Sequence, residues 1–546
     1  TQTSVGGAGG ITDGANIGLA GDATSSLTAD NFGGGDLAGY SNADGGVGAA
    51  GNSTASGGAG GSATASINLS GNSSAAVSGA ANADGASGGQ NVSGSSGAGG
   101  NATASSTGTG SNASSTFDAI ARGGTGGTAF SGSAGSGGSA TGTTTVTNNT
   151  GNAVAKIDVF GGRGGTGLNG ADSGAGGYAI ANTEASSTGT GTSVGVYSVD
   201  VIAGNGGTIT DGSGSQAGAG GFAISGATGT GNGNVNVLVD DIEVRGGTGG
   251  SVSSGTGSGG DGGSALSTAS GTNSGSERVF VRTTADGGAG GSGRGALGQS
   301  GDGGEAQANA FGISTGTGTV YVTATADGGA GGNSVDGSAG GRGGDASSYS
   351  YGSGGETTNA SASATGGNGI QGDFDGTALA QATARGQSGT VSSDAYSGGG
   401  MISSLRSSAT ASVAGTSVTE ASAGVSSAVI DPSLALDLEA VAYGIGLPGI
   451  SDINTALAGN SNVMSNFDVG GTSDILGMVV LGGAYSDDFF GASYTYSSFV
   501  DWDLDMSLLG SQQDMLIGFL DPMFSENGFD SMNFRIEMEG SLVENQ

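Results

Sequence analysis

The stretch ADGGAGGNSVDGSAGGRGGDA, residues 326–346, decides the fold because more than half of it is glycine or alanine. Glycine loses more backbone freedom on folding than any other residue, so a large amount of it in an ordered chain needs a structural reason. Similar stretches recur about every 40 residues through the first three-quarters of the chain. The reason must therefore lie in the architecture of the whole molecule.

A repeat of 38 to 43 residues organises this part of the sequence. Each unit contains a first glycine-rich mark, usually GGxGG, and a second mark related to GxGG, and self-similarity at such a period is typical of stacked repeat architectures. The first marks begin at Gly6, Gly45, Gly85, Gly123, Gly161, Gly204, Gly246, Gly287, Gly328 and Gly366.

Two short alternating runs lie between the second mark and the next first mark. In EAQANAF, Ala306, Ala308 and Ala310 share one side, and in VYVTATAD the residues Val320 and Val322 do the same. An alternation of apolar and polar residues predicts β-strands, and the short STGTGT segment between the runs predicts a tight connection. Because the inward side chains are small, the facing layers must lie close together.

The glycine-rich part follows a period of three, which is the period of polyproline II. Ser334 and Ser173 are the exceptions in the two clearest units. The three prolines of the chain lie outside the repeats, so the pattern predicts polyglycine-II-like crossings whose backbone groups bond to neighbouring units. The glycines in this frame are Gly328, Gly331, Gly337, Gly340 and Gly343, and Gly161, Gly164, Gly167, Gly170 and Gly176.

The predicted fold class is all-β: an elongated, β-solenoid-like rod of about ten units at residues 1–395. At about 4.8 Å per strand, the rod would be on the order of 100 Å long if all strands stacked in one series, and half that if the two strands of a unit belonged to different sheets. A transition segment is expected at 396–430, and a β-sandwich domain at 431–546, where most of the Met residues and the single Trp lie.

Composition excludes several classes of function. The net charge of −35 argues against nucleic-acid binding, which depends on Lys and Arg. With no His and no Cys, the common general bases and thiol nucleophiles are missing, so we expect no catalytic residues, no required cofactor and no enzyme activity. No apolar run is long enough to predict a membrane span.

Calcium is the metal ion for which the sequence offers candidate ligands. Asp501, Asp503 and Asp505 alternate along a predicted strand, and Asp286 and Asp327 each precede a first glycine mark. Neighbouring carboxylates of one strand face lie about 6.6 Å apart and can share a hard cation. The alternative for such a row is a solvated strand face.

The pattern GGxGG…GxGGxAxAxA…VxVxAxADGG resembles the Gly-rich β-strand-repeat proteins that Gram-negative bacteria export. The tail MLIGFLDPMFSENGFDSMNFRIEMEG resembles the ends of extracellular proteins of the PEP-CTERM, exosortase-linked kind, although the chain has no Pro-Glu-Pro motif. The resemblance implies an extracellular or cell-surface location.

Three functions fit these features. The first is a structural subunit of an extracellular filament or biofilm-matrix fibre that self-associates head to tail, since the ends of a strand stack are sheet edges. The second is ice binding through Thr-rich arrays such as TGTTTVT at residues 141–147. The third is an adhesin stalk that carries a carbohydrate-binding domain, with a matrix polysaccharide as a candidate partner.

Overall fold

The computed structural model describes most of the repeat region and isolated strands beyond it. The described residues are 1–10, 17–31, 33–53, 55–72, 75–111, 113–355, 357–370, 375–386 and 390–398, followed by the strands at 405–413, 419–425, 439–446, 477–484, 500–501, 535–538 and 541–545. Every regular element among them is a β-strand. The predicted all-β, solenoid-like class is therefore confirmed.

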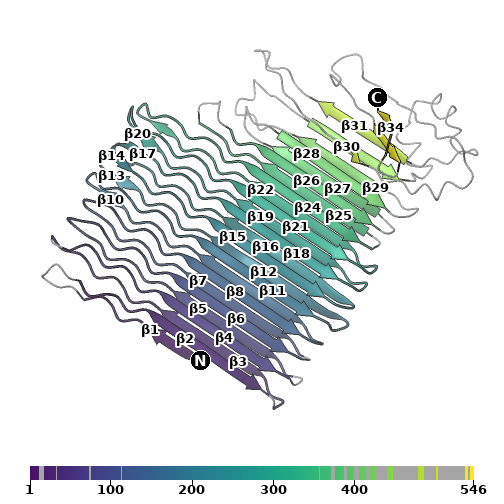
Figure 1. Ribbon diagram of the computed structural model, residues 1–546, viewed down its shortest axis with the longest axis horizontal. Helices are drawn as coiled ribbons and strands as arrows, with labels where there is room; N and C mark the ends of the chain where they lie inside the picture. Colours follow the sequence, from purple (N-terminus) through teal and green to yellow (C-terminus); the bar gives the residue numbers. More distant parts are fainter. Residues whose placement is uncertain are drawn as a thin grey trace, which may run out of the picture.

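Two parallel sheets of 12 strands each run the length of the stack (Figure 1). Sheet A consists of β1 (Gln2–Val5), β3 (Leu37–Asp44), β5 (Val77–Asp84), β7 (Ser115–Arg122), β9 (Ala153–Phe160), β12 (Thr192–Ile202), β16 (Val235–Arg245), β19 (Val279–Asp286), β22 (Val320–Asp327), β25 (Thr357–Thr365), β27 (Thr390–Gly398) and β29 (Thr419–Val425). Sheet B consists of β2 (Ala23–Asn31), β4 (Ala63–Gly71), β6 (Ala102–Gly110), β8 (Ala140–Asn148), β11 (Ala179–Ser187), β15 (Ala223–Gly231), β18 (Ala265–Asn273), β21 (Ala306–Ser314), β24 (Ala346–Gly354), β26 (Ala378–Gly386), β28 (Leu405–Val413) and β32 (Val500–Asp501).

The two strands of one unit lie in different sheets, so the shorter of the two expected lengths, about 50 Å, applies to the stack. Each strand pairs with its equivalent one unit further along, as β21 does with β24, where Ala306 lies opposite Ala346. The short connection after β21 therefore carries the chain from one sheet to the other instead of forming a hairpin. The stack also continues past residue 395, because β28 and β29 belong to the sheets.

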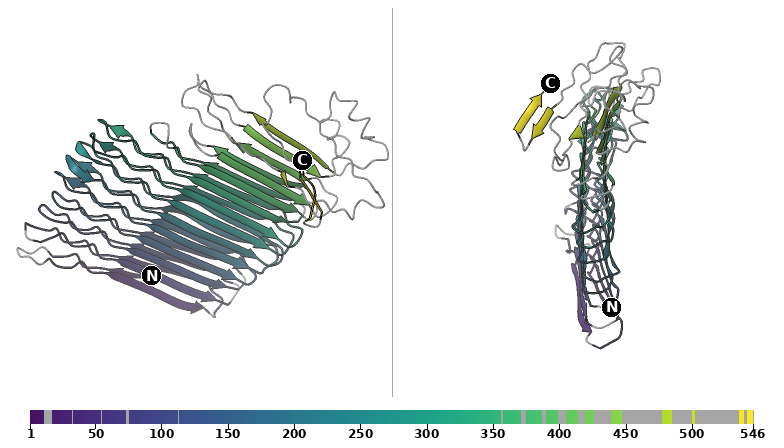
Figure 2. Two further views of the ribbon diagram at one scale, coloured as in Figure 1. Left: turned by 45° about the horizontal axis from the view of Figure 1, so that its top comes forward. Right: turned by 90° about the vertical axis from the view of Figure 1, so that its right-hand side faces the viewer.

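A thin core of small side chains separates the sheets, and Figure 2 shows the flat, two-layered profile. Ala306, Ala308 and Ala310 are at most 3% exposed, as the alternation predicts. Where a larger side chain occurs, a glycine faces it. A Cβ on Gly108 would lie 1.8 Å from the Phe117 ring, so close packing requires glycine there.

The glycine-rich segments connect the end of each sheet A strand to the start of the next sheet B strand, and all of them extend to the same side of the two sheets (Figure 2). Where the sequence predicts one crossing per unit, the structure contains two antiparallel passes joined by a turn. In the unit of residues 328–344, Gly344 donates its N–H to the carbonyl of Gly329 at 2.7 Å, which ties the return pass to the outward pass. The frame of three breaks at the turn, where Asp336 and Gly337 have φ values of 52° and 86°.

Small strands form where neighbouring turns meet. β14 (Gly212–Gln216), β17 (Gly255–Ser258), β20 (Gly293–Arg294) and β23 (Ser334–Val335) make a four-stranded sheet, and β10 (Gly167–Leu168) pairs with β13 (Ile209–Thr210). The tips of the passes are thus linked from unit to unit.

The C-terminal region is described only at its strands. β30 (Glu439–Gly446) pairs antiparallel with β31 (Gly477–Ala484), and β33 (Arg535–Met538) with β34 (Ser541–Asn545). β30 contacts β29 at the end of sheet A. The predicted β-sandwich otherwise lies outside the described residues, as do Asp503 and Asp505.

Candidate functional site

The glycine passes contain an unbroken line of backbone hydrogen bonds parallel to the stack axis. Gly344 donates to Gly329 (2.7 Å), Gly329 to Gly304 (2.9 Å), and Gly304 to Gly288 (2.7 Å). The same relay continues from unit to unit as far as the bond from Gly21 to Gly7. Because each residue of the relay donates through its N–H and accepts through its C=O, it ties its own pass to the passes on both sides.

Two of every three positions in a pass face neighbouring backbone and are nearly always glycine, and alanine replaces glycine at a few of them, such as Ala86 of the relay. Gly328 and Gly331 donate to the next unit, whereas Gly329 donates to the preceding unit. A Cβ on Gly328 or Gly329 would lie 2.0 Å from a backbone carbonyl oxygen. The third position, occupied by Ala330 and Asn333, is exposed. The sequence interpretation identified only one glycine frame, although the repeated GG doublet is the signal for two.

The predicted glycines fall into two structural groups. A Cβ would lie within 2.2 Å of a backbone oxygen at Gly161, Gly164, Gly167, Gly176, Gly328, Gly331 and Gly343, and 2.7 Å from one at Gly340. Gly170 and Gly337 instead occupy tip turns with positive φ.

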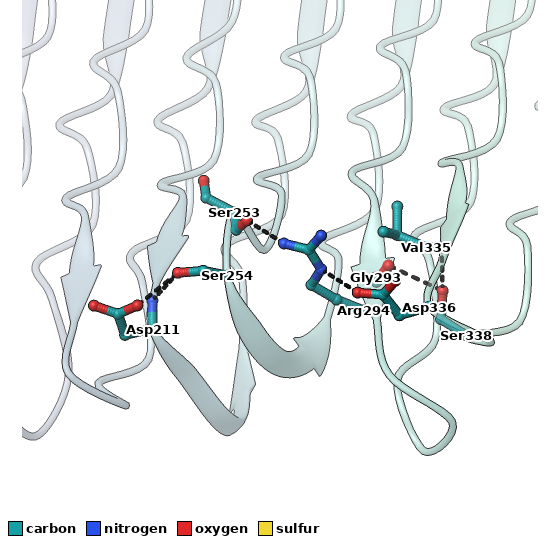
Figure 3. Close-up of polar contacts among 8 residues, drawn as sticks. All are labelled: Asp211, Ser253, Ser254, Gly293, Arg294, Val335, Asp336 and Ser338. Carbon is teal, nitrogen blue, oxygen red and sulfur yellow. Dashed lines mark hydrogen bonds and ion pairs between the residues drawn. The ribbon is translucent and has the colours of Figure 1, made fainter.

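Side chains at the tips hold adjacent turns together (Figure 3). Ser254 donates to the carboxylate of Asp211 at 2.6 Å, and the Arg294 Nε donates to Asp336 at 2.7 Å. Ser338 donates to the carbonyl of Gly293 at 2.9 Å. Asp211 and Asp336 are exposed, and each contact joins one unit to the next, so this cluster stabilises the stack.

The predicted acidic pair lies together at the ends of β19 and β22, where Asp286 and Asp327 are register partners. Burial raises the pKa of Asp286, and the charge of Asp327 raises it further, while Arg245 lowers it. Within the described part of the chain, no group of three or more acidic, His or Cys residues is arranged to hold a metal ion. Asp501 lies in β32 of sheet B, whereas Asp286 and Asp327 lie in strands of sheet A.

A buried polar cluster that the sequence did not reveal lies inside the stack. Asp241 of β16 is fully buried, accepts a hydrogen bond from Ser225 at 2.8 Å, and accepts a second from Ser267. Ser198 and Thr283 are its register partners on β12 and β19. Burial raises the pKa of Asp241 to about 7, although its serine partners lower it.

Hydroxyl side chains occupy 14 of the 16 outward positions of sheet B from β2 to β8. We call these positions the hydroxyl face. Register places equivalent side chains in rows across the four strands. The rows are Thr24, Thr64, Thr103 and Thr141; Ser26, Ser66, Ser105 and Thr143; Thr28, Asn68, Thr107 and Thr145; and Asp30, Ser70, Thr109 and Thr147.

Among the described strands, the edge strands β1 and β2 each pair with one neighbour, β3 and β4 respectively. Neither contains Lys, Arg or Pro, which natural proteins use to block edge pairing. Val5 is 70% exposed, and no heavy atom lies within 4 Å of the Cβ position of Gly7, although the equivalent position on Gly46 meets a carbonyl oxygen at 2.0 Å. This edge presents backbone donors and acceptors in the geometry that every other unit uses for stacking.

The geometry defines the class of protein as a parallel β-solenoid whose glycine-rich passes pack together on one side of the two sheets. No family model, curated protein or solved structure matches the chain. Among the described residues, none forms a helix of the length and apolar character that crossing a bilayer requires.

Proposed function

We propose that this chain is a structural subunit of an extracellular or cell-surface filament, and that it assembles head to tail through the ends of its stack. The observation that carries the proposal is the unblocked edge formed by β1 and β2. A second chain that docks its C-terminal region there, where β30 covers β29, would add strands to the free edge, and a heterologous contact of this kind repeats without closing. The resemblance to exported glycine-rich repeat proteins supports the location.

Backbone hydrogen bonds would provide most of the contact energy. The N–H groups of Gly6 and Ala23 already bond to the neighbouring unit, so those of Thr3, Val5, Thr24 and Ser26, which have the opposite parity, face the free edge. Like charges on two subunits oppose assembly, and salt screens this repulsion. We therefore expect filaments to form more readily at higher ionic strength.

Proline at the free edge is expected to abolish filaments while leaving the subunit folded. In Thr3→Pro combined with Ser26→Pro, each proline removes an N–H that faces the free edge. The matched control is Thr3→Ala combined with Ser26→Ala, which retains both N–H groups. Negative-stain microscopy and sedimentation velocity over a concentration series would measure assembly, and circular dichroism would verify folding.

The wild-type chain and the alanine control should form fibres that lengthen with concentration. Monomers at every concentration would refute the proposal, and discrete dimers would show a closed contact in place of an open one. If the proline variant formed fibres of the same length and at the same concentrations as wild type, the β1 and β2 edge would be excluded as the assembly site.

The hydroxyl face favours a second candidate, binding to ice. Its positions repeat every 4.7–4.9 Å across strands and about 6.6 Å along them, and a rigid backbone holds them in one plane. Asp30 is the only charged residue among the 16 positions. A regular, nearly uncharged hydroxyl array can order water in a lattice.

Thr103→Lys and Thr143→Lys should abolish thermal hysteresis if the hydroxyl face binds ice, because a long charged side chain breaks the plane of the array. Thr323→Lys on the outer face of sheet A is the control and should behave as wild type. Absence of thermal hysteresis in the wild-type chain would eliminate this candidate without affecting the filament proposal.

A further inference from the structure

The outer face of sheet B changes in character between its two halves. On β21 and β24 the outward positions include Phe311, Tyr349 and Tyr351, all half-buried. The rings of Phe311 and Tyr349 lie 5.6 Å apart between centroids and are tilted by 47°, and Arg385 lies 6.0 Å from the centre of the Tyr351 ring. Amide side chains of Asn309 and Gln381 flank Tyr349 as its register partners. We call these residues the aromatic surface.

A groove of about 580 Å³ adjoins the aromatic surface at the starts of β15, β18, β21, β24 and β26. Ile224, Leu266 and Leu379 contribute apolar side chains to its lining, and Glu305 and Asp345 contribute carboxylates. Gln307 and Ser347 line the groove and precede Asn309 and Tyr349 by two residues on their strands. Side chains two residues apart share a sheet face and lie about 6.6 Å apart, so the groove and the aromatic surface are continuous.

At the other end of the groove lies a second aromatic group. Phe222 lines the groove, is 40% exposed, and stacks on Tyr178 with ring centroids 5.1 Å apart and an interplanar angle of 12°. The apolar and aromatic groups thus extend over successive strands in the direction of the stack axis. A linear ligand is the shape that would contact all of them.

The charge of the surroundings restricts the ligand. The protein carries a net charge of −35, and both titratable groups of the groove lining are acidic. These charges would repel an anionic polymer. The remaining chemistry combines aromatic faces, which pack against apolar C–H groups, with amides and carboxylates that bond to hydroxyl groups.

We propose that the groove and the aromatic surface together bind a neutral polysaccharide chain that lies along the stack axis. The rings of Tyr349 and Tyr351 stack on the C–H faces of sugar rings, while Asn309, Gln381 and Gln307 bond to sugar hydroxyls. Tyrosine suits this role because it supplies a large contact area with few rotatable bonds. The site is independent of the edge strands and hence of filament assembly.

Affinity gel electrophoresis of the full chain tests this proposal. Native gels would contain no polymer, a neutral polymer (dextran, laminarin or hydroxyethyl cellulose) or alginate as the anionic comparison. At least one neutral polymer should retard the wild-type chain, and alginate should not. Tyr349→Ala and Tyr351→Ala should each raise the dissociation constant about tenfold.

Two controls separate binding from folding. Tyr321→Ala removes an outward tyrosine of sheet A on β22 and should leave retardation unchanged. Tyr351→Phe keeps the ring and should retain most of the affinity. The proposal is overturned if no neutral polymer retards the protein, if alginate retards it equally, or if Tyr321→Ala weakens binding as much as Tyr349→Ala at matched thermal stability.

Discussion

Gly329→Ala is expected to destabilise the stack by about 1–3 kcal/mol, which is the usual cost of forcing an extra methyl group into a close-packed site. The new Cβ would lie 2.0 Å from the carbonyl oxygen of Gly288 and 2.8 Å from the N–H nitrogen of Gly304. Both atoms belong to backbone that is fixed by hydrogen bonds on either side, so they must shift to make room for the methyl group. Ala86 occupies the equivalent position in another unit and keeps both of its relay bonds, so we expect a loss of stability and not a loss of the fold. The strain would pass to the neighbouring units, because repeat units contact only their neighbours.

The adjacent residue provides the matched control. Ala330 is exposed at the third position of the same pass, so Ala330→Ser should change the free energy of unfolding by less than about 0.5 kcal/mol. Thermal unfolding followed by circular dichroism would give both values, and hydrogen exchange would locate the loss of protection in Gly329→Ala. Equal stabilities of the two variants would contradict the close contact between the passes.

Asp241→Asn is expected to remove a pH dependence of stability that amounts to about 4 kcal/mol in the wild-type chain. Burial raises the pKa of Asp241 from 3.8 to about 7 in the folded state. Between these values the folded protein retains a proton that the unfolded chain has lost. The contribution of Asp241 to wild-type stability is therefore highest below pH 3.8, falls as the pH rises to about 7, and stays low above it.

The asparagine variant should be more stable than wild type at pH 8, because its neutral amide has no charge to desolvate. It can still accept from Ser225 and donate to Ser267, so the two proteins should be similar near pH 4. Denaturant unfolding at intervals from pH 4 to pH 8 would measure the difference. A wild-type chain whose Asp241-dependent stability rises with pH would contradict the assignment of a buried neutral carboxyl.

Local sequence patterns predicted the strands well because their side-chain period is strict. Val320 and Val322 alternate with polar residues, and both are buried in the core. The period of three likewise predicted the polyglycine-II-like passes. The pattern did not predict the turn at Asp336 and Gly337, since a change of chain direction needs only two residues with positive φ.

The candidate sites were less predictable than the strands. Hydroxyl rows, the aromatic surface and the cluster around Asp241 each combine residues about 40 positions apart, and one sequence does not specify their register. Phe311 and Tyr349 become neighbours only because β21 and β24 pair in parallel without a shift. Asp286 and Asp327 were singled out by the repeat itself, and the same parallel register brings them together.

By itself, the sequence determined that this protein is a stack of small-cored β-strands and glycine-rich passes, because glycine, alanine and the periods of two and three leave few other ordered solutions. Only the tertiary structure decided that the strands of a unit lie in opposite sheets and that each glycine crossing doubles back. Those choices depend on backbone hydrogen bonds between units. Side-chain patterns do not encode them, because a peptide group bonds in the same way whatever residue carries it.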